Sequence, residues 1–460
     1  MEKIEKYAYI SEPVSIDINM DEILLIVDDK KGKNGEKLYN VNEDALNILK
    51  RFTGQYKLKE IIEQLSIYYN EKFDETKTKL ISFLNLIEST YDINIKYSID
   101  KINKEIKIKD NQNNYLPRTI SIELTHKCNF KCLHCYGGYD NEKSEMMDTN
   151  KLKQFIGQCK NLGVQAIELT GGEITMHPDI CEILEYIYQL DFKMVSLLTN
   201  GFIKNEKLYD LIVSHKENTI VQIDMHGNTE SYLNWFTQVP NTKKRVEENI
   251  KFLHNNGVFM RVVTVATPLN IEQIEDIADW VHDIGIKSYG ISPVIPTGRA
   301  NEESEKLLFT STENLNKLED AIYNITQKYG KKFLNLLEDY NSMRANCGAF
   351  VINASIAPNG DLKVCSMDGL DVTNSIGNVF KENIKDIYEK NLDLLKKYKN
   401  LESPNLNMEG CKNCEHVYFC QGCVLRGFSK GVEIGDKCYW LKNIVPTEVK
   451  EKLLDIPVMA

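Results

Sequence analysis

The cysteines in the first half of the chain have a spacing that could hold a metal cluster. Cys128, Cys132 and Cys135 lie in one short segment, in the pattern Cys-x3-Cys-x2-Cys. Three thiolates this close together can ligate three irons of a 4Fe–4S cube, which leaves the fourth iron open to substrate or cofactor chemistry. A tetrahedral zinc site would instead need a fourth protein ligand, and His126 or His134 could supply it. The spacing alone therefore leaves an open cluster and a zinc site as alternatives.

A second group of cysteines lies near the end of the chain. Its seven members are Cys347, Cys365, Cys411, Cys414, Cys420, Cys423 and Cys438. Seven thiolates are one fewer than two complete 4Fe–4S sites require. A hairpin is expected between the first two, because the segment 356–361 contains Pro, Asn, Gly and Asp. Structural zinc, which is redox-silent, is the alternative for some of these ligands.

The remaining two of the twelve cysteines are expected to be inert. Cys159 and Cys181 lie in helix-like stretches, where a buried thiol behaves as a small apolar side chain. The segment Met1–Tyr9 is charged and lacks the apolar core of a secretory signal, so we expect a cytoplasmic protein. Because a reducing cytoplasm disfavours disulfides, metal or redox chemistry is favoured for the other cysteines.

Composition argues against several classes of function. The 460 residues are 42% hydrophobic and 27% charged, a balance typical of globular proteins. With 56 Lys and Arg against 67 Asp and Glu, the net charge is −11, which argues against bulk nucleic-acid binding. Apolar runs long enough to span a bilayer are absent from the sequence, so no membrane partner is expected.

Three further motifs follow strand-like runs. Thr170-Gly171-Gly172-Glu173 follows one run, Thr199-Asn200-Gly201 follows the next, and Asp224 lies at the end of a third. Two adjacent glycines allow a ligand to approach the backbone closely, and the carboxylate of Glu173 could accept hydrogen bonds from an ammonium group. Ligands of parallel α/β folds bind at the carboxyl ends of the strands, so we expect these motifs to meet the first cysteine segment there.

The elements that must position these residues alternate regularly. Short strand-like runs are separated by amphipathic helix-like stretches, which predicts a parallel α/β sheet in the form of a partial (β/α)6 TIM-like barrel. The expected strands are 119–124, 164–169, 194–198, 220–225, 259–266 and 288–292. We therefore expect a polar linker over 101–117, a barrel core over 118–300, bridging helices over 301–345 and a metal-stapled domain over 346–460.

Residues 1–100 are expected to form a separate winged-helix unit. Two strand-like runs, 23–27 and 37–41, can pair as a hairpin, and Asn42 can cap the first of three helices that follow. Winged helices usually bind DNA, but these residues include 14 Lys and Arg against 19 Asp and Glu, a net charge of −5. Capture of a peptide as an added strand at the hairpin edge suits this charge better. A purely structural appendage is the alternative.

Residues 118 to about 300 resemble the core of a radical S-adenosylmethionine (SAM) enzyme. The family's cluster motif matches at the first three cysteines, and its Gly-Gly-Glu motif, which binds the methionine amino group, matches at residues 171–173. The resemblance places His134 near the adenine and Asp224 near the ribose, and it makes Arg261 a candidate partner of the methionine carboxylate. One departure is the segment Asp-Met-His-Gly from Asp224, where many relatives have Ser-Leu-Asp-Gly. Another is Ile174, where Pro is common.

The C-terminal cysteines resemble those of a SPASM domain, which carries auxiliary clusters in peptide-modifying radical enzymes. The resemblance implies three 4Fe–4S clusters in total, one of them binding SAM and two of them auxiliary. One auxiliary cluster would be fully ligated and the other would keep an open iron: the first set is Cys411, Cys414, Cys420 and Cys438, and the second is Cys347, Cys365 and Cys423. Two residues separate Cys420 from Cys423, where three are more common.

Residues 1–100 also resemble a RiPP recognition element, a winged helix that binds the leader part of a ribosomally made precursor peptide. Together the modules resemble the sactipeptide synthases, on segments that begin at Glu123, Gly171, Asn346 and Gly422. The resemblance implies an enzyme that installs Cys thioether crosslinks in a precursor peptide, with flavodoxin or ferredoxin as reductant.

Other functions are consistent with the same modules. Such an enzyme could instead epimerise a peptide, form carbon–carbon crosslinks, or oxidise Cys or Ser. Epimerisation needs a hydrogen donor, for which Cys159 and Cys181 are poor candidates. An Fe–S electron carrier or a peptide-binding protein without turnover is the alternative from a different class, although a carrier needs no open iron.

Overall fold

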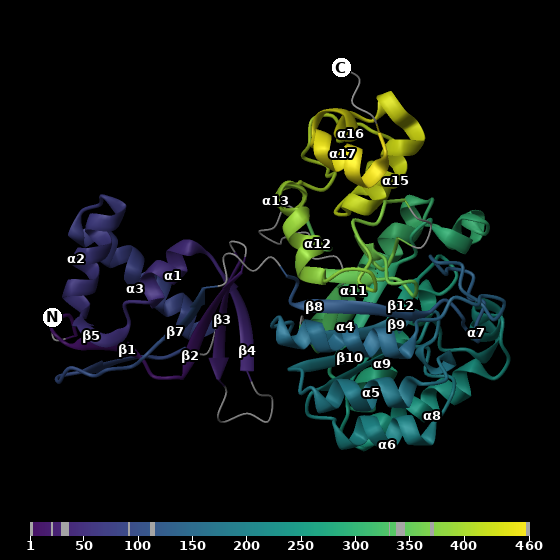
Figure 1. Cartoon of the computed structure of the whole chain (residues 1–460), viewed down its shortest axis with the longest axis horizontal. Helices are drawn as coiled ribbons and strands as arrows, with labels where there is room; N and C mark the ends of the chain where they lie inside the picture. The colour runs from purple at the N-terminus through teal and green to yellow at the C-terminus, as the bar shows by residue number, and fades with distance from the viewer. Residues whose placement is uncertain are drawn as a thin grey trace. The chain divides into compact units, whose positions relative to one another are not determined.

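The computed structural model describes residues 3–19, 22–28, 36–90, 93–110, 116–330, 332–336, 346–368 and 372–456. The chain divides into two compact units, Met1–Tyr115 and Leu116–Ala460. Figure 1 shows the first unit as a small set of strands and helices in purple and blue, and the second as a layered α/β body.

The first unit contains two small sheets and three helices. One sheet has the strand order β5-β1-β6 and consists of β1 (Tyr7–Ile10), β5 (Thr53–Lys57) and β6 (Ile95–Ser98). The other has the order β4-β3-β2-β7 and consists of β2 (Val14–Asn19), β3 (Glu22–Asp28), β4 (Glu36–Val41) and β7 (Lys107–Asp110). The helices are α1 (Glu43–Leu49), α2 (Leu58–Tyr69) and α3 (Phe73–Thr90).

The predicted hairpin and helix cap of this unit are both present. β3 pairs antiparallel with β4, with Leu25 opposite Tyr39, and the side chain of Asn42 accepts a hydrogen bond from the amide of Ala45 at 2.8 Å. The segment expected to be a linker contains β7, which pairs in parallel with β2. Its sequence, Lys-Ile-Lys-Asp, has a single apolar residue, so the hydrophobic pattern does not reveal a strand there. The winged-helix assignment stays a prediction.

The second unit is built on one nine-stranded sheet with the order β14-β13-β12-β11-β10-β9-β8-β15-β16. Neighbouring strands are parallel throughout, except that β16 runs antiparallel to β15. The strands are β8 (Thr119–Thr125), β9 (Ala166–Gly171), β10 (Met194–Thr199), β11 (Thr219–Asp224), β12 (Phe259–Ala266), β13 (Tyr289–Pro293), β14 (Leu334–Leu336), β15 (Asn353–Ile356) and β16 (Leu362–Lys363).

The predicted α/β core is confirmed as a large parallel sheet of the partial-barrel type. All six expected strands are present as β8 to β13. The sheet is wider than expected, because β14 extends one edge and the β15–β16 hairpin extends the other. Both additions are short and partly polar, which explains why the hydrophobic pattern missed their place in the sheet. The hairpin itself is the one predicted between Cys347 and Cys365.

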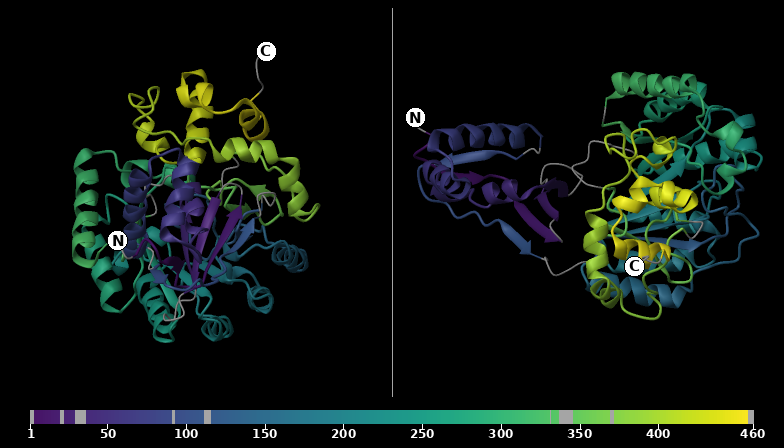
Figure 2. Two further views of the ribbon diagram at one scale, coloured as in Figure 1. Left: turned by 90° about the vertical axis from the view of Figure 1, so that its left-hand side faces the viewer. Right: turned by 90° about the horizontal axis from the view of Figure 1, so that it is seen from above.

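Helices follow most strands of this sheet. Those between β8 and β14 are α4 (Thr149–Asn161), η1 (Ile174–Met176), α5 (Ile180–Gln189), α6 (Glu206–Ser214), α7 (Glu230–Thr237), α8 (Thr242–Asn255), α9 (Ile271–Asp283), η2 (Gly298–Asn301), α10 (Ser304–Leu307) and α11 (Thr312–Tyr329). The C-terminal ones are α12 (Ile384–Lys390), α13 (Leu392–Lys399), α14 (Val417–Cys420), α15 (Val424–Ile434), η3 (Gly435–Lys437), α16 (Tyr439–Asn443) and α17 (Thr447–Leu454). Figure 2 shows the last helices, in yellow, grouped together.

Strand β8 shows how the sheet positions a site. Its apolar side chains Ile120, Ile122 and Leu124 are fully buried, and they alternate with buried polar residues. Because successive side chains of a strand point to opposite faces, the polar set, which includes Ser121 and Glu123, lies on the other face of the sheet. That polar face leads directly into the cysteine segment.

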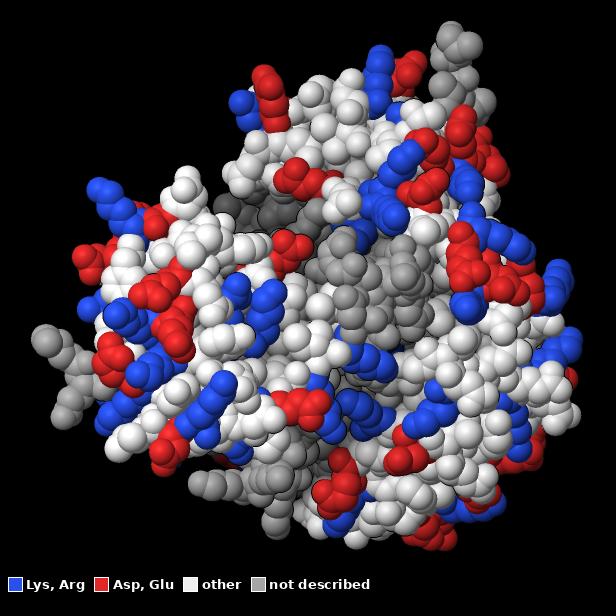
Figure 3. Space-filling view, turned by 60° about the vertical axis from the view of Figure 1, so that its left-hand side comes forward, with Lys and Arg blue, Asp and Glu red and all other residues white. Residues whose placement is uncertain are grey.

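Charge on the surface is mixed. On the face shown in Figure 3, Lys and Arg side chains are interspersed with Asp and Glu, so neither sign dominates that face. Among the described residues, the helices lack the combination of length and apolar character that crossing a bilayer requires.

Candidate active site

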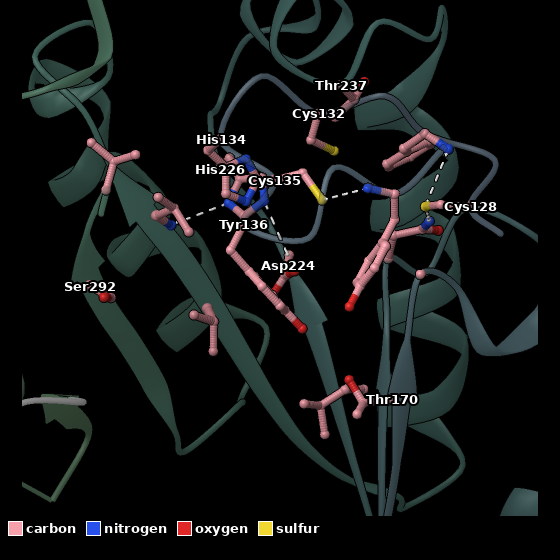
Figure 4. A pocket seen from close by; sticks show the side chains of 18 of the residues that line it. Cys128, Cys132, His134, Cys135, Tyr136, Thr170, Asp224, His226, Thr237 and Ser292 are labelled. Atoms are coloured by element: carbon pink, nitrogen blue, oxygen red, sulfur yellow. Dashed lines mark hydrogen bonds and ion pairs between the residues drawn. The ribbon is translucent and has the colours of Figure 1, made fainter. Parts of the chain in front are cut away.

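A cavity of about 360 Å³ lies at the carboxyl ends of the barrel strands. Its wall includes Cys128, Cys132 and Cys135 from the loop after β8, Asp224 from the end of β11, and Ser292 from β13 (Figure 4). The strand-end positions in the sequence predicted this convergence, since parallel strands bring their carboxyl ends to one edge of the sheet.

The two glycines after β9 let the cysteine loop pack against the strand. A Cβ on Gly171 would lie 2.4 Å from the carbonyl oxygen of Thr125, and one on Gly172 would lie 2.4 Å from that of Lys127. Gly171 also has φ = +122°, a conformation that favours glycine. The amide of Gly172 donates to the carbonyl of Thr125 at 2.7 Å, and that of Glu173 donates to Lys127 at 3.0 Å. These glycines therefore support the cysteine loop as well as lining the cavity.

Glu173 is almost fully buried, and its carboxylate is bound by the protein itself. Oε1 accepts hydrogen bonds from the amide and hydroxyl of Thr175, at 3.0 and 2.8 Å, and from the hydroxyl of Thr199 at 2.7 Å. Oε2 accepts from the amide of Asn200 at 2.7 Å. In this structure Glu173 thus joins the ends of β9 and β10, just behind the cavity-lining residues Thr199 and Asn200.

The thiols of Cys128 and Cys132 lie in an environment that disfavours thiolates until a cation is present. Burial raises the pKa of Cys128 to about 12, and the negative charge of Glu173 acts in the same direction. Burial also raises the pKa of Cys132 well above its usual value, and Cys128 and Cys135 add to this because the three groups are close together. A bound iron–sulfur cluster would reverse the effect, since metal ions supply the positive charge that thiolates need.

The surroundings of the sulfur atoms fit an iron–sulfur cluster. The amide of Phe130 donates to Sγ of Cys128, and that of Tyr139 donates to Sγ of Cys135, both at 3.4 Å. Nδ2 of Asn200 lies 3.9 Å from Sγ of Cys128. Hydrogen bonds to cluster sulfurs are a recurrent feature of such sites. Within the described ranges, three His, Cys, Asp or Glu side chains do not converge closely enough anywhere to hold a single metal ion.

Asp224 occupies the cavity wall with a strongly perturbed carboxyl group. Burial raises its pKa from 3.8 to about 7, the charge of Glu173 adds to this rise, and Arg261 opposes it. About 41% of its side-chain surface is exposed, and this surface faces the cavity, which explains why a partly exposed group is still poorly solvated. A carboxyl group in this state can accept or donate a hydrogen bond near neutral pH.

Two histidines and a phenylalanine form an aromatic wall beside Asp224. The ring of His134 stacks on that of Phe236, with the ring centroids 4.7 Å apart. The ring of His226 packs edge-on against the ring of His134, with the centroids 4.6 Å apart. Burial lowers the pKa of His134 to about 4 and that of His226 well below its usual value, so both rings are neutral at pH 7. Nδ1 of His226 accepts from the amide of Val265, which places its proton on Nε2, 4.0 Å from Oδ2 of Asp224.

Arg261 lies on β12 but does not line the cavity. Burial lowers the pKa of its guanidinium, while the charges of Glu168 and Asp224 oppose the change. Gly290 leaves room for it, since a Cβ there would be 3.3 Å from Nη2. Nε and Nη2 are buried and have no hydrogen-bond partner among the described residues. Arg261 is therefore near enough to Asp224 for their charges to interact, but it lies outside the cavity wall.

An ion pair that no local sequence pattern indicates joins β8 to β16 across the sheet. Glu123, which is fully buried at the end of β8, binds Nζ of Lys363 on β16 at 3.3 Å. Its other oxygen lies 3.1 Å from Nε2 of His126 and 3.5 Å from the hydroxyl of Tyr139. An acidic residue close to a cysteine motif could have suggested that a cationic partner was needed. That partner could not be identified as Lys363 from the sequence, because the contact depends on the pairing of β15 with β8.

A second cavity, of about 660 Å³, brings together four of the C-terminal cysteines. Its lining includes Cys411, Cys414, Cys420 and Cys438, the set that the resemblance assigned to a fully ligated cluster. Burial raises the pKa of the Cys420 thiol to about 12, and Cys438 and Cys414 add to the effect because they lie nearby.

The other three C-terminal cysteines also lie near one another. Burial raises the pKa of Cys365 to about 12, and the charges of Cys347 and Cys423 act in the same direction. The residues that follow Cys365, Ser366 and Met367, line the first cavity. The C-terminal cysteine region therefore reaches the same space as the first cysteine loop.

Two known families match this chain. The Radical SAM superfamily matches residues 122–281, and an iron–sulfur cluster-binding domain called SPASM matches residues 347–415. The first range contains the cysteine loop and the Gly-Gly-Glu motif. The second begins at Cys347 and includes Cys414, while the last three cysteines lie beyond it.

Several known proteins are similar over most of their length. The chain is 26% identical over 407 residues to AlbA, the antilisterial bacteriocin subtilosin biosynthesis protein of Bacillus subtilis, with 88% of each chain covered. It is 26% identical over 335 residues to an AdoMet-dependent heme synthase of Methanosarcina barkeri, covering 68% of this chain and 93% of that one. The crystal structure of Streptococcus suis SuiB bound to the precursor peptide SuiA superposes with a TM-score of 0.61 at 16% identity, covering 95% and 99% of the two chains. This last likeness establishes a shared fold.

Proposed function

Because this chain is a radical SAM protein with a SPASM domain, we propose that it installs Cys thioether crosslinks in a ribosomally made precursor peptide. Similarity to AlbA, a protein of subtilosin biosynthesis, extends over 88% of both chains and supports this activity. SuiB, which has the same fold, is bound to a precursor peptide in its crystal structure, and this supports a peptide as substrate.

The observation that carries the proposal is that segments from both cysteine regions line one cavity. The first cysteine loop forms one part of the cavity wall, and Ser366 and Met367, directly after Cys365, form another. Thioether formation needs a carbon to be activated and a sulfur to be brought to it within one enclosed space. A cavity bordered by both cysteine regions provides such a space.

The residues present fit the groups that radical SAM and SPASM domains bind. Cys128, Cys132 and Cys135 would ligate the first 4Fe–4S cluster, and the seven C-terminal cysteines would ligate the auxiliary clusters. When bound, SAM and these clusters supply the one-electron chemistry that removes a hydrogen atom from a peptide carbon.

The side chains of the chain itself bind, orient and exclude water. We assign the neutral ring of His134 and the carboxyl group of Asp224 to the SAM site, because both line the cavity and both lie beside His226. Val263 and Val265 contribute apolar lining on the β12 side. Such lining protects a reactive species from water and from side reactions. Glu173 holds the β9 and β10 ends in place through Thr199 and Asn200.

The first unit is proposed to bind the leader segment of the precursor. Strand β4 is an edge strand of its four-stranded sheet, so one side of its backbone can pair with an added strand. This role rests on the edge geometry and on the acidic composition of residues 1–100. A flavodoxin or ferredoxin in the cytoplasm is the proposed reductant.

Peptide epimerisation is less well supported by the structure. That reaction needs a hydrogen donor at the reaction cavity. Cys159 is fully buried on α4, and Cys181 lies on α5; neither belongs to the cavity wall.

The test uses the anaerobically reconstituted chain with dithionite, SAM and the precursor peptide encoded beside its gene. We expect 5′-deoxyadenosine and a peptide that loses the mass of two hydrogen atoms for each thioether. Unchanged peptide mass with altered stereochemistry would instead show an epimerase.

The matched control is the variant with Cys128, Cys132 and Cys135 replaced by Ala, which removes the proposed ligands of the first cluster and leaves the other nine cysteines intact. It is expected to form no 5′-deoxyadenosine. Cofactor cleavage at the wild-type rate would show that these thiols do not hold the reactive cluster.

A further inference from the structure

Arg299 follows β13, the last of the six expected barrel strands, and holds the cysteine loop that follows β8, the first of them. It lies in η2, a few residues after β13, and it lines the same cavity as the loop. Its Nε donates to the carbonyl oxygen of Cys132 at 2.9 Å, and its Nη2 donates to that of Tyr139 at 2.7 Å. Its own amide donates to the carbonyl oxygen of Cys135 at 3.0 Å. One residue therefore binds the loop at three points that span two of the cluster cysteines.

The backbone next to Arg299 is shaped for this contact. Gly298 has φ = +55°, and a Cβ at this position would lie 2.3 Å from the carbonyl oxygens of both Cys135 and Tyr136. Only a residue without a side chain allows the two loops to approach so closely. The approach brings the guanidinium of Arg299 against the loop rather than into solvent.

The charge of Arg299 is largely enclosed and only weakly neutralised. Its side chain is 12% exposed, and Nη1 lies 3.7 Å from Oδ2 of Asp140, which is longer than a charge-assisted hydrogen bond. Arg299 also lines the cavity that contains the three thiols. Its guanidinium therefore lies beside the backbone of Cys132 and borders the same space as the three sulfur atoms.

We propose that Arg299 is a positioning residue for the first iron–sulfur cluster, which holds the cysteine loop through its planar fork and raises the reduction potential of the cluster through its charge. The proposal rests on the proposed function, because it takes the first three cysteines as cluster ligands. A guanidinium fork suits the first task, since it presents several donors in fixed directions. The second follows because net charge near a cluster is one of the factors that set its potential.

The test compares Arg299→Lys with Arg299→Met in the full-length, reconstituted chain without peptide. Lys keeps the charge and loses the fork, whereas Met loses both. The readouts are iron content per chain and the midpoint potential of the cluster whose electron paramagnetic resonance signal changes when SAM is added. Arg51→Met is the matched control, since Arg51 lies in the first unit and its guanidinium donates to the carbonyl oxygen of Asn47.

We expect the midpoint potential of this cluster in Arg299→Lys to stay close to that of the wild type, because the charge is kept. The midpoint potential in Arg299→Met should be clearly lower than in both. Both variants should retain less iron than the wild type, because each loses the fork. Equal potentials in wild type and Arg299→Met, or in the two variants, would overturn the proposed role of the charge. Wild-type iron retention in both variants would overturn the proposed role of the fork.

A second variant keeps the proposal testable if Arg299→Met fails to fold. Asp140→Asn removes the nearby negative charge and leaves Arg299 in place, so the potential should shift upward, opposite in sign to Arg299→Met. A downward shift or no shift would contradict the proposal. If no signal of the wild-type chain responds to SAM, the proposed function itself fails, which is a different result from any of these.

Discussion

Replacement of Asp224 by Asn offers a direct check of the cavity's electrostatics. The carboxyl group lies on the cavity wall, and burial, aided by the charge of Glu173, raises its pKa from 3.8 to about 7. Between these two values the unfolded chain releases the proton while the folded chain retains it. Ionisation in this range therefore favours unfolding, so the stability of the wild-type chain decreases as the pH rises from about 4 to about 7. Asn cannot ionise and avoids this loss.

The magnitude follows from the size of the shift. A rise of roughly 3 pKa units corresponds to about 4 kcal/mol for a fully enclosed group, at about 1.4 kcal/mol per unit. Since 41% of the side-chain surface is open to the cavity, solvent screening reduces this, and we expect about 2 kcal/mol in total. Roughly 1 kcal/mol of this should develop between pH 5 and pH 8.

The assay is chemical denaturation of the chain without SAM, with the wild type and Asp224→Asn compared at pH 5 and pH 8. The stability of the variant relative to the wild type should increase at the higher pH. Asp279→Asn is the control, because the pKa of Asp279 is shifted in the opposite direction from that of Asp224. Burial acts to raise the pKa of Asp279, but hydrogen bonds from Lys328 and Tyr329 outweigh it and lower the pKa. This control should therefore lose stability relative to the wild type near neutral pH, because the favourable ionised form is removed.

A relative stability of Asp224→Asn that is the same at both pH values would refute the reasoning. It would show that Asp224 is as well solvated in the folded chain as in the unfolded one. A loss of stability at pH 8 would show that the ionised carboxylate has a favourable partner instead.

Two further predictions concern the supports of the cysteine loop. Lys363→Met should destabilise the second unit by ~3 kcal/mol, because it leaves the fully buried Glu123 without its cation. The double variant with Glu123→Gln should recover part of this in thermal melting, and equal melting of the single and double variants would argue against a buried pair. Gly172→Ala should reduce iron in the first cluster, because the new Cβ would meet the carbonyl of Lys127 at 2.4 Å. Wild-type iron content, measured beside the exposed-glycine control Gly163→Ala, would contradict this.

Much of the barrel could be predicted because its strands are apolar and regularly spaced. The six expected strands are present as β8 to β13. The edge additions β14 and β15 could not be predicted in the same way, because they are short and their place in the sheet depends on pairing across long sequence distances. The pairing of β15 with β8 also explains why Lys363 meets Glu123, a contact that no local pattern indicates.

The candidate site was predictable in its position but less so in its contacts. Cys128, Asp224 and His134 meet at one cavity, as their strand-end positions indicated. Glu173 and Arg261 are near it but do not line it. Their hydrogen bonds and burial depend on side chains from neighbouring strands, which a single sequence does not reveal. Arg299 was missed for the same reason, although its place after a barrel strand followed the rule that located the others.

The most direct test of the account uses electron–nuclear double resonance on the reduced, cluster-loaded chain with SAM labelled isotopically at its amino nitrogen and carboxylate. The account predicts hyperfine coupling between these labels and the cluster held by Cys128, Cys132 and Cys135, and loss of the coupling when the three are replaced by Ala. A reduced cluster at these residues that shows no coupling to either label would contradict the claim that its fourth iron is open to SAM.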